Sequence, residues 1–355
     1  MTFIESFNKI LDEHNINNSN DLYIYGLGTT GRLLSELCEY SGIDLSGIIV
    51  GNGYKNAESF SGYPVFYIDD IKENGYILYT VKGTVPDELL GYKNLIDVSS
   101  VGFYWELLNY WYDEFFRRNA DRILFQNDLM IWDKLKIINP QIIAQDEWDS
   151  FLQEAGDMLV PYFFDEYKRI DEGTYSYHNV VIKEGDVVVD AGAHIGMFSA
   201  LAAYMGAAKV YSFEPMKSNY KYLQRQALEY SQIIPVNKAL DVECRDMYIS
   251  VDGSSSSMYL ENDAPNKELI SCYTLDDYVE NNNIDRIDFI KADIEGAECN
   301  MLRGATRVLR EYAPKLAICT YHRPTDKEDI TKIIKEANPK YKIEYKWKKL
   351  FATVN

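Results

Sequence analysis

The stretch from Val187 to Ala200, VVVDAGAHIGMFSA, constrains the fold of this chain more than any other part of its sequence. Consecutive valines predict a buried strand, Asp190 stands at its end, and small residues lead from there into an apolar helix. A strand, a thin loop and a helix form the first part of a βαβ unit, and open α/β sheets bind ligands at the carboxyl ends of their strands. We therefore expect an α/β fold with a ligand site at this loop.

The residues of this loop indicate which ligand it binds. Gly192, Ala193 and Gly196 keep it thin, but the spacing D-x-G-x-x-x-G differs from the G-x-G-x-x-G that places a pyrophosphate at a helix start. A carboxylate at Asp190 repels a pyrophosphate and suits an ammonium group. The next strand, in KVYSFEP, ends in Glu214, whose carboxylate can accept hydrogen bonds from ribose hydroxyls. S-adenosylmethionine has an ammonium group and a ribose but no pyrophosphate, so it is the expected ligand.

Two further polar residues are assigned to the same ligand. Asn237 and Asp241 surround the end of the third strand of this half, where we expect them to flank the adenine ring. A structural alternative stays open for the acids, in which Asp190 only caps the helix and Glu214 is a solvated turn residue.

The motifs that follow are TLDDY, IDFIKADIEGAE with LRGA, and YHRPTD, in that order along the chain. Together with GDVVVDAGAHIGMFS and KVYSFEP, they resemble the FkbM family of S-adenosylmethionine-dependent methyltransferases, over roughly residues 175 to 350. The resemblance implies a Rossmann-like seven-stranded methyltransferase sheet. It also implies methyl transfer to an oxygen atom, often on a glycan or a natural-product precursor.

Four side chains are candidates for the chemistry at the same sheet edge. Asp293 and Glu295 follow the strand in IDFIKA, whereas His322 and Asp326 follow the strand in LAICTY. A hydroxyl acceptor needs a positioned base or a metal ion. We prefer His322 as the base because its ordinary pKa of about 6.5 suits the task. Asp293 would lie nearest the reacting centre and line the donor site, and Glu295 would act there or only hold the turn at Gly296.

A metal ion is the alternative to a histidine base. Asp293, Glu295 and His322 offer an oxygen-rich ligand set that would suit magnesium or manganese. The preferred interpretation has no metal.

A second glycine loop, GLGTTG, lies near the N-terminus after the predicted strand Leu22 to Tyr25. Gly26, Gly28 and Gly31 match G-x-G-x-x-G, but the acidic residue expected about 20 positions later to bind a ribose is not evident. Three roles stay open for this loop: an NAD site, a nucleotide-sugar or phosphate site, and a structural or docking role.

The 355 residues exceed the size at which a single core usually stops growing, so we expect more than one domain. Residues 1–100 predict a small Rossmann-like βαβ domain for nucleotide binding or docking, and residues 173–355 the FkbM-like methyltransferase domain. Residues 101–172 predict a helical connector, because large apolar side chains recur every four positions from Phe103 to Phe115. An aromatic floor for a sugar is the alternative role of this stripe.

The composition of the chain limits the classes of molecule that it is expected to bind. A net charge of -19 opposes binding to nucleic acid or to an anionic membrane through a general basic field. The five cysteines show no C-x-x-C pair, no apolar run is long enough to span a membrane, and the first residues do not resemble a signal peptide. We therefore expect a cytoplasmic protein with a small-molecule or glycan acceptor, and the sequence makes no prediction of its oligomeric state.

Three functions are compatible with these motifs. The preferred one is an S-adenosylmethionine-dependent O-methyltransferase acting on a hydroxyl of a sugar, a sugar nucleotide, or a glycan or natural-product intermediate. The second is an NAD-dependent sugar-nucleotide oxidoreductase that uses GLGTTG, and the absent ribose carboxylate disfavours it. The third is a non-catalytic protein that binds nucleotide sugars, and the presence of Asp190, Glu214, Asp293 and His322 disfavours it.

Overall fold

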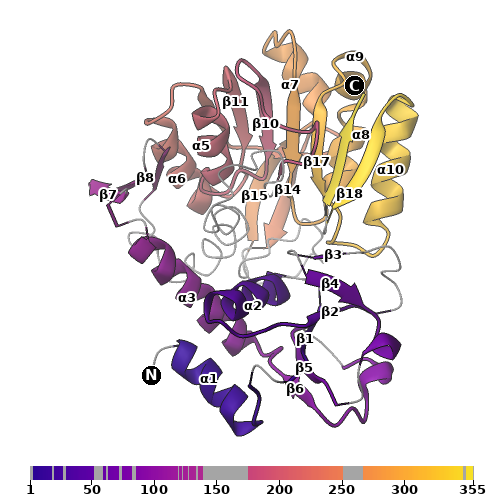
Figure 1. Cartoon of the computed structure of the whole chain (residues 1–355). Helices are drawn as coiled ribbons and strands as arrows, with labels where there is room; N and C mark the ends of the chain where they lie inside the picture. The colour runs from indigo at the N-terminus through magenta and orange to yellow at the C-terminus, as the bar shows by residue number, and fades with distance from the viewer. Residues whose placement is uncertain are drawn as a thin grey trace. The chain divides into compact units, whose positions relative to one another are not determined.

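The structure of the chain is a computed structural model. The residues that it describes are 3–17, 20–26, 29–51, 59–60, 63–71, 74–81, 85–118, 120–121, 123–126, 128–132, 135–138, 175–250, 267–346 and 349–354. The chain divides into two compact units, Met1–Arg118 and Asn119–Asn355 (Figure 1). Each unit is described by itself below.

The first unit is built on a six-stranded sheet in the order β3-β4-β2-β1-β5-β6. The strands are β1 (Leu22–Tyr25), β2 (Gly47–Ile49), β3 (Ser59–Phe60), β4 (Tyr63–Phe66), β5 (Tyr76–Tyr79) and β6 (Leu95–Asp97). All neighbouring strands are parallel except β3 and β4, which agrees with the βαβ alternation of the sequence. The elements outside the sheet are α1 (Phe3–Glu13), α2 (Thr29–Tyr40), α3 (Val101–Arg118) and the short 3₁₀ helices η1 (Ile68–Asp70) and η2 (Asp87–Leu89).

Helix α3 belongs to the first unit and extends it beyond the expected boundary at residue 100. Leu107 and Trp111 of its apolar stripe are buried, and the Trp111 indole donates a hydrogen bond of 3.1 Å to the Leu33 carbonyl in α2. These two side chains of the stripe therefore pack inside the first unit. The side chain of Phe115 lies outside the described residues.

Among its described residues, the expected helical connector, residues 101–172, is helical from Val101 to Arg118. A three-stranded antiparallel sheet follows it, made of β7 (Ile123–Gln126), β8 (Leu129–Trp132) and β9 (Leu135–Ile138). The physical reason is local: ILFQ, LMIW and LKII are short runs of β-forming residues separated by short turns, and such runs favour hairpins over a continuous helix. Residues 139–174 lie outside the described part of the chain.

This small sheet belongs to the second unit and is bound to α6 (Lys217–Ala227). The side-chain amide of Gln226 accepts a hydrogen bond from the Ile138 N–H at 3.0 Å and donates one to the Lys136 carbonyl at 2.8 Å. Arg225 forms a bidentate ion pair with Asp128. Gln226 therefore pairs with β9 much as another strand would.

The second unit has a seven-stranded sheet in the order β12-β11-β10-β16-β17-β19-β18. Its strands are β10 (Val187–Ala191), β11 (Lys209–Phe213), β12 (Ile233–Val236), β16 (Phe289–Ala292), β17 (Lys315–Cys319), β18 (Lys342–Lys346) and β19 (Lys349–Thr353). The first five in spatial order are parallel, and β19 is antiparallel to both β17 and β18. A smaller sheet joins β13 (Ala239–Leu240), β14 (Arg245–Ser250) and β15 (Lys267–Tyr273).

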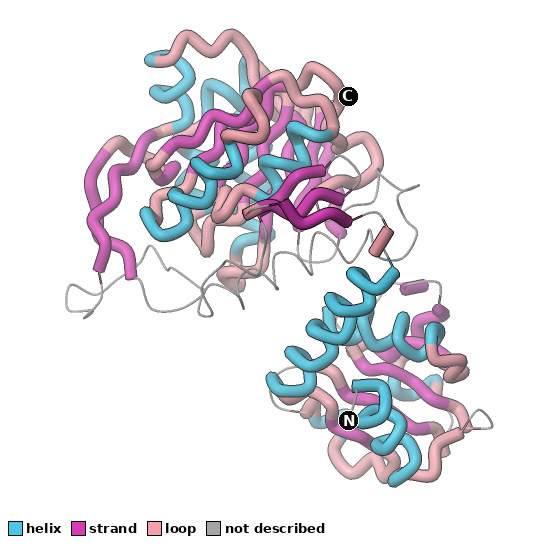
Figure 2. Tube along the Cα trace, turned by 90° about the vertical axis from the view of Figure 1, so that its left-hand side faces the viewer, coloured by secondary structure: helices cyan, strands magenta, loops and turns pink. Residues whose placement is uncertain are grey.

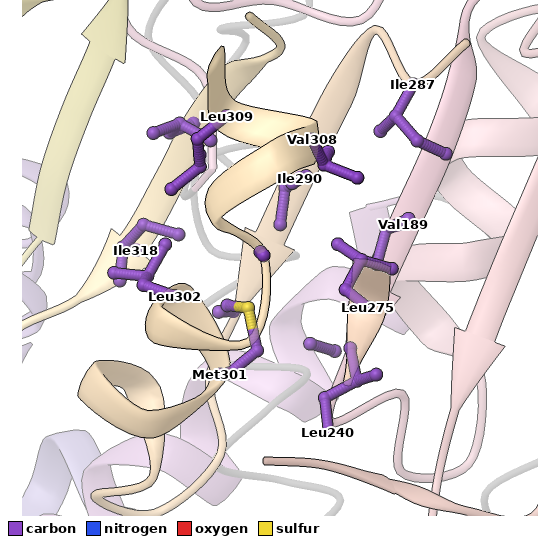
Figure 3. Close-up of a cluster of buried hydrophobic side chains, with 14 of the residues drawn as sticks. Val189, Leu240, Leu275, Ile287, Ile290, Met301, Leu302, Val308, Leu309 and Ile318 are labelled. Carbon is purple, nitrogen blue, oxygen red and sulfur yellow. The ribbon is translucent and has the colours of Figure 1, made fainter. Parts of the chain in front are cut away.

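The strands of this sheet bury different residues on their two faces, because side chains alternate along a strand. Val189, Ile290 and Ile318 point to a core that includes Leu302 and Val308 from the helices that cover this face (Figure 3). Those helices are α7 (Leu275–Asn281), α8 (Glu298–Arg303), α9 (Thr306–Glu311) and α10 (Asp326–Ala337). Helix α5 (Met197–Tyr204) lies on the other face, where Ser199 contacts Asp190.

Parallel alignment places the carboxyl ends of β10, β11, β16 and β17 along one edge of the sheet. The loops after these strands carry most of the predicted site residues. Figure 2 shows the helices and strands of each unit along the Cα trace. Within the described residues, no helix combines the length and the apolar character that crossing a membrane requires.

Candidate active site

The glycine loop, residues 192–196, connects β10 to α5 and touches the neighbouring strand end. Gly192 has φ of 77°, and a Cβ atom there would lie only 2.0 Å from the Asp293 carbonyl oxygen. Gly196, the residue before α5, has φ of 93°, and its Cβ would lie 2.9 Å from the Leu223 side chain. Gly192 therefore excludes a side chain by conformation and by space, and Gly196 excludes one by conformation. Ala193, between them, is fully buried.

Glu214 ties the glycine loop to the loop after β11. Its Oε2 accepts a hydrogen bond of 2.9 Å from the His194 N–H, and its Oε1 accepts one of 2.9 Å from the Met216 N–H. Burial raises the pKa of this carboxyl, although His194 and the two N–H groups oppose the shift. Asn219 adds a side-chain hydrogen bond, and because a carboxylate offers about four lone-pair sites, the group keeps acceptor capacity for a ligand.

Asp190 lies at the end of β10, but its carboxylate is occupied inside the protein. One oxygen accepts a hydrogen bond of 2.6 Å from the Ser199 hydroxyl, and the other lies 3.0 Å from the Lys291 ammonium. The side chains of Asp190 and Lys291 are 0% and 3% exposed. A direct contact between Asp190 and a ligand's ammonium group, as the sequence suggested, would have to compete with Lys291.

The two residues assigned to the adenine ring make structural contacts. Asn237 donates hydrogen bonds of 2.9 Å to the carbonyls of Glu214 and Pro215, which holds the loop after β11. Asp241 is fully buried and accepts hydrogen bonds from Arg245 at 2.7 and 3.0 Å. Asn237 is therefore linked to Glu214, whereas the contacts described for Asp241 connect it to Arg245 and the small sheet.

His322, after β17, lies among carboxylates from the loop after β16 and from α8. Its Nε2 is 3.5 Å from an oxygen of Asp293 and 3.5 Å from an oxygen of Glu295, while its Nδ1 is 3.0 Å from Glu298 Oε1. We call these four residues the histidine–carboxylate cluster. The structure thus brings together the three residues that the sequence suggested and adds Glu298.

The ionisation of the cluster follows from burial and from its mutual charges. Burial by itself lowers the pKa of His322, but the hydrogen bond and charge of Glu298, with the charges of Asp293 and Glu295, outweigh it and raise that pKa. Burial raises the pKa of Glu295. Burial also opposes ionisation of Asp293, yet nearby positive charges, Lys291 first, hold the pKa of that carboxyl below its ordinary value. Asp293 is therefore an anion next to a histidine that readily holds a proton.

Two tyrosines orient the Asp293 carboxylate. The buried Tyr175 donates a hydrogen bond of 2.8 Å to Oδ2, and the exposed Tyr321 donates one of 3.2 Å to Oδ1. Asp326, the remaining acid of the sequence-based set, is buried and accepts a hydrogen bond of 2.7 Å from the Arg323 N–H. It stabilises the turn before α10.

Glu298 is the residue that the sequence-based assignment missed. It is fully buried at the start of α8, and its Oε1 also accepts a hydrogen bond of 2.9 Å from the Ile294 N–H. The signal was present in DIEGAE, because an acid just after a glycine turn and at a helix start points back toward the strand end. The motif therefore provides three acids to His322.

The cluster also contains a ligand set for a divalent cation. Side-chain ligand atoms of Asp293, Glu298 and His322 lie within 4.8 Å of one another, so Glu298 replaces Glu295 in the geometric group. The Oε2 atom of Glu298 is buried and has no hydrogen-bond partner among the described residues. Two carboxylates and an imidazole fit magnesium or manganese.

In the N-terminal glycine loop, the described glycines serve close packing. A Cβ at Gly31 would lie 2.3 Å from the Gly26 carbonyl oxygen, and one at Gly26 would lie 2.7 Å from the Val81 side chain. Gly26 has φ of 121°. These glycines let β1, α2 and the end of β5 approach one another. Gly28 lies outside the described residues, and the ligand of this loop stays a prediction.

Comparison with known proteins connects this site to one domain family. Residues 190–341 match the model of the methyltransferase FkbM domain. The hexuronic acid methyltransferase AglP of Haloferax volcanii is 24% identical over 156 residues, which are 44% of this chain and 64% of that protein. The match thus spans less than two thirds of that protein.

Solved structures with low sequence identity were also found. The methyltransferase FkbM of Methylobacillus flagellatus KT is 20% identical and has a TM-score of 0.42, with coverage of 97% of this chain and 92% of that one. Fibrillarin of Aeropyrum pernix, solved with natively bound S-adenosyl-L-methionine, is 14% identical and has a TM-score of 0.32. That match covers 49% of this chain and 68% of the fibrillarin chain.

Proposed function

Because residues 190–341 match the model of the methyltransferase FkbM domain, we propose that the protein is an S-adenosylmethionine-dependent O-methyltransferase. Its acceptor is a hydroxyl group of a sugar, a sugar nucleotide, or a glycan or natural-product intermediate. The observation that carries the proposal is the contact between the glycine loop and Asp293, where no Cβ fits between Gly192 and the Asp293 carbonyl. A donor held at this loop lies beside the histidine–carboxylate cluster.

The residues around the glycine loop suit the donor. Glu214 keeps acceptor capacity beyond the hydrogen bonds that it accepts from the protein, and such a carboxylate can accept a hydrogen bond from a ribose hydroxyl. Gly192 and Gly196 add no side chain of their own to the loop backbone. Bound S-adenosylmethionine supplies a methyl group that its sulfonium already activates for displacement. The protein then has to orient the acceptor and remove its proton.

His322 is the base in this proposal. The Glu298 carboxylate next to Nδ1 favours the tautomer with a proton on that nitrogen, and Nε2 is then free to take the hydroxyl proton. The Asp293 and Glu295 carboxylates, 3.5 Å from Nε2, stabilise the imidazolium that results. Because these charges raise the pKa of His322, turnover increases with pH through a value above that of an ordinary histidine.

The charge of the cluster favours a neutral acceptor. AglP is named for methyl transfer to a hexuronic acid, and a carboxylate acceptor would need no base. In this chain, Asp293, Glu295 and Glu298 surround the base and repel an anionic acceptor group. A hydroxyl has a proton to lose and no charge, so it matches the cluster better than a carboxylate does.

The experiment follows a labelled methyl group. The full chain is incubated with S-adenosylmethionine carrying a radioactive methyl and, separately, with methyl β-D-glucopyranoside, methyl β-D-galactopyranoside, glucuronic acid and UDP-glucose. We expect label in a product that withstands mild alkali, since a methyl ether is stable and a methyl ester is not. Label only in an alkali-labile product would reject the hydroxyl acceptor, and a protein that neither binds nor uses the donor would reject the methyltransferase.

A parallel reaction with EDTA examines the cation alternative. Undiminished turnover after removal of divalent ions would exclude a metal at Asp293, Glu298 and His322, and we expect that result because His322 already has its own counter-ions. A complete loss that magnesium or manganese restores would instead assign the deprotonation to the metal.

A further inference from the structure

Lys291 is a buried lysine whose ammonium contacts the donor side of the site. It lies in β16, directly opposite Asp190 of β10, and is 2% exposed. Its Nζ is 3.0 Å from Asp190 Oδ1 and donates hydrogen bonds to the Gly192 carbonyl at 2.6 Å and the Ala191 carbonyl at 3.4 Å. Two of these three oxygens belong to the backbone at the start of the glycine loop.

Stability does not explain why a charge is kept at this position. Taking an ammonium and a carboxylate out of water costs several kcal/mol per ion by order of magnitude, and apolar side chains of similar volume often replace such pairs without loss. The aromatic rings of Tyr175 and Phe198 already surround Nζ, at 5.4 and 5.8 Å from their centroids. A methionine would fit such surroundings. We therefore attribute the ammonium group to the hydrogen bonds that it donates to the two backbone carbonyls.

Those hydrogen bonds set the course of the loop. The Gly192 carbonyl turns toward Nζ, and the chain leaves the strand with φ of 77° at this residue. On the other side, the N–H groups of Gly192 and Ala193 donate to the Phe213 carbonyl at 3.0 and 2.9 Å. The loop is thus held by Lys291 from β16 and by the end of β11, and each contact fixes the backbone rather than a side chain.

We propose that Lys291 is a positioning residue of the methyl-donor site, which holds the Ala191 and Gly192 carbonyls and thereby shapes the glycine loop, with Asp190 as its counter-ion. This inference rests on the proposed function. In this inference the Asp190 carboxylate pairs with the Lys291 ammonium, and not with the ammonium group of the donor. The pair is neutral as a whole, so a cationic donor can lie next to it without repulsion from Lys291.

Lys291 also connects the donor side to the acceptor side. Burial opposes ionisation of Asp293, and Lys291 is the largest of the positive charges that nevertheless hold the pKa of this carboxyl below its ordinary value. Asp293 directly follows β16, the strand that carries Lys291. One ammonium therefore acts on the glycine loop and on the carboxylate that faces His322.

The two roles of Asp190 predict opposite effects of one substitution. If Asp190 bound the donor's ammonium, Lys291→Met would free its carboxylate, and S-adenosylmethionine would bind as tightly or more tightly. If Lys291 positions the loop, the same substitution removes the donor of two backbone hydrogen bonds, and binding weakens. Lys315→Met is the matched control, because Lys315 also pairs with an aspartate and a carbonyl (Asp186 and Val181, both at 2.6 Å), at the amino end of β17.

The experiment measures dissociation constants by calorimetry for S-adenosylmethionine and for its demethylated product, which lacks the sulfonium charge. We expect Lys291→Met to weaken both at least ten-fold, and Lys315→Met to leave both unchanged. The double variant Asp190→Asn/Lys291→Met removes the unpaired carboxylate. It should regain thermal stability relative to Lys291→Met while its affinity stays at least ten-fold reduced.

Each result decides between the alternatives. Unchanged or tighter binding by Lys291→Met, or by the double variant if the single one does not fold, would overturn the positioning role. Weakening of the sulfonium compound alone would assign an electrostatic role instead and would overturn it as well. A wild-type protein that binds neither compound would overturn the proposed function and this inference with it, so the two failures are distinguishable.

Discussion

Replacement of Gly192 by alanine measures how closely the glycine loop approaches the acceptor side. The new Cβ would lie 2.0 Å from the Asp293 carbonyl oxygen and 3.0 Å from the Ile294 side chain. The nearest atom is backbone and cannot rotate away. Either the loop or the strand end must move by about 1.4 Å to restore van der Waals contact, which changes the distance between the donor site and Asp293.

Gly185 provides the control with the same backbone cost. It has φ of 85° against 77° for Gly192, but a Cβ there meets no atom within 4 Å. A left-handed alanine costs roughly 1–2 kcal/mol at either position. Overpacking adds about 1–3 kcal/mol at Gly192 alone. We therefore expect Gly185→Ala to lose roughly 1–2 kcal/mol of unfolding free energy and Gly192→Ala about 2–5 kcal/mol.

The assay is urea unfolding of the full chain with and without the demethylated cofactor product. The transition of the second unit is the one that moves to higher urea when this compound binds. Comparison of midpoints at equal slopes gives the stability difference between variants. We also expect Gly192→Ala to lose measurable affinity for S-adenosylmethionine and Gly185→Ala to keep it. Equal destabilisation by the two alanines, with equal affinity, would refute the close approach and with it the contact that carries the proposed function.

Two further predictions concern the histidine–carboxylate cluster. His322→Gln should lower turnover about 10²- to 10⁴-fold with unchanged donor affinity. The control is His178→Gln, which alters an exposed histidine paired with Glu344 at 2.8 Å and should change turnover little. Near-normal turnover of His322→Gln would remove His322 from the base role. Glu298→Gln deletes the hydrogen-bonded charge that raises the pKa of His322, so the inflection in the pH profile of kcat/KM should move to lower pH. An unmoved inflection would mean that Glu298 does not act through His322.

The meeting of Asp293, Glu295 and His322 could be predicted because it follows from strand polarity. All three follow parallel strands that are neighbours in the sheet, and their side chains share one edge. Local spacing also predicted the strand, the loop and the start of the helix from Val187 to Ala200. Contacts set by neighbouring backbone and by apolar periodicity are visible in a single sequence.

Contacts between side chains on neighbouring strands of the sheet could not be predicted in the same way. Lys291 pairs with Asp190 because β10 and β16 are adjacent in a register that joins residues 101 positions apart, and the sequence contains no sign of that register. Glu298 begins a helix, where an acid can equally be solvated, so its burial beside His322 is not visible in the sequence. The strands β7 to β9 were hidden by the helical periodicity that precedes them.

The two hydrogen bonds between the Gln226 side chain and β9 have a practical consequence for the design of shortened proteins. A fragment starting at residue 173 would match the domain boundary that sequence motifs suggest, yet it would lack the Ile138 N–H and the Lys136 carbonyl. The amide of Gln226, now 1% exposed, would lose both backbone partners. A fragment that begins at Asn119 keeps the hydrogen bonds between Gln226 and β9. It is the truncation that we recommend for crystallisation and ligand soaking.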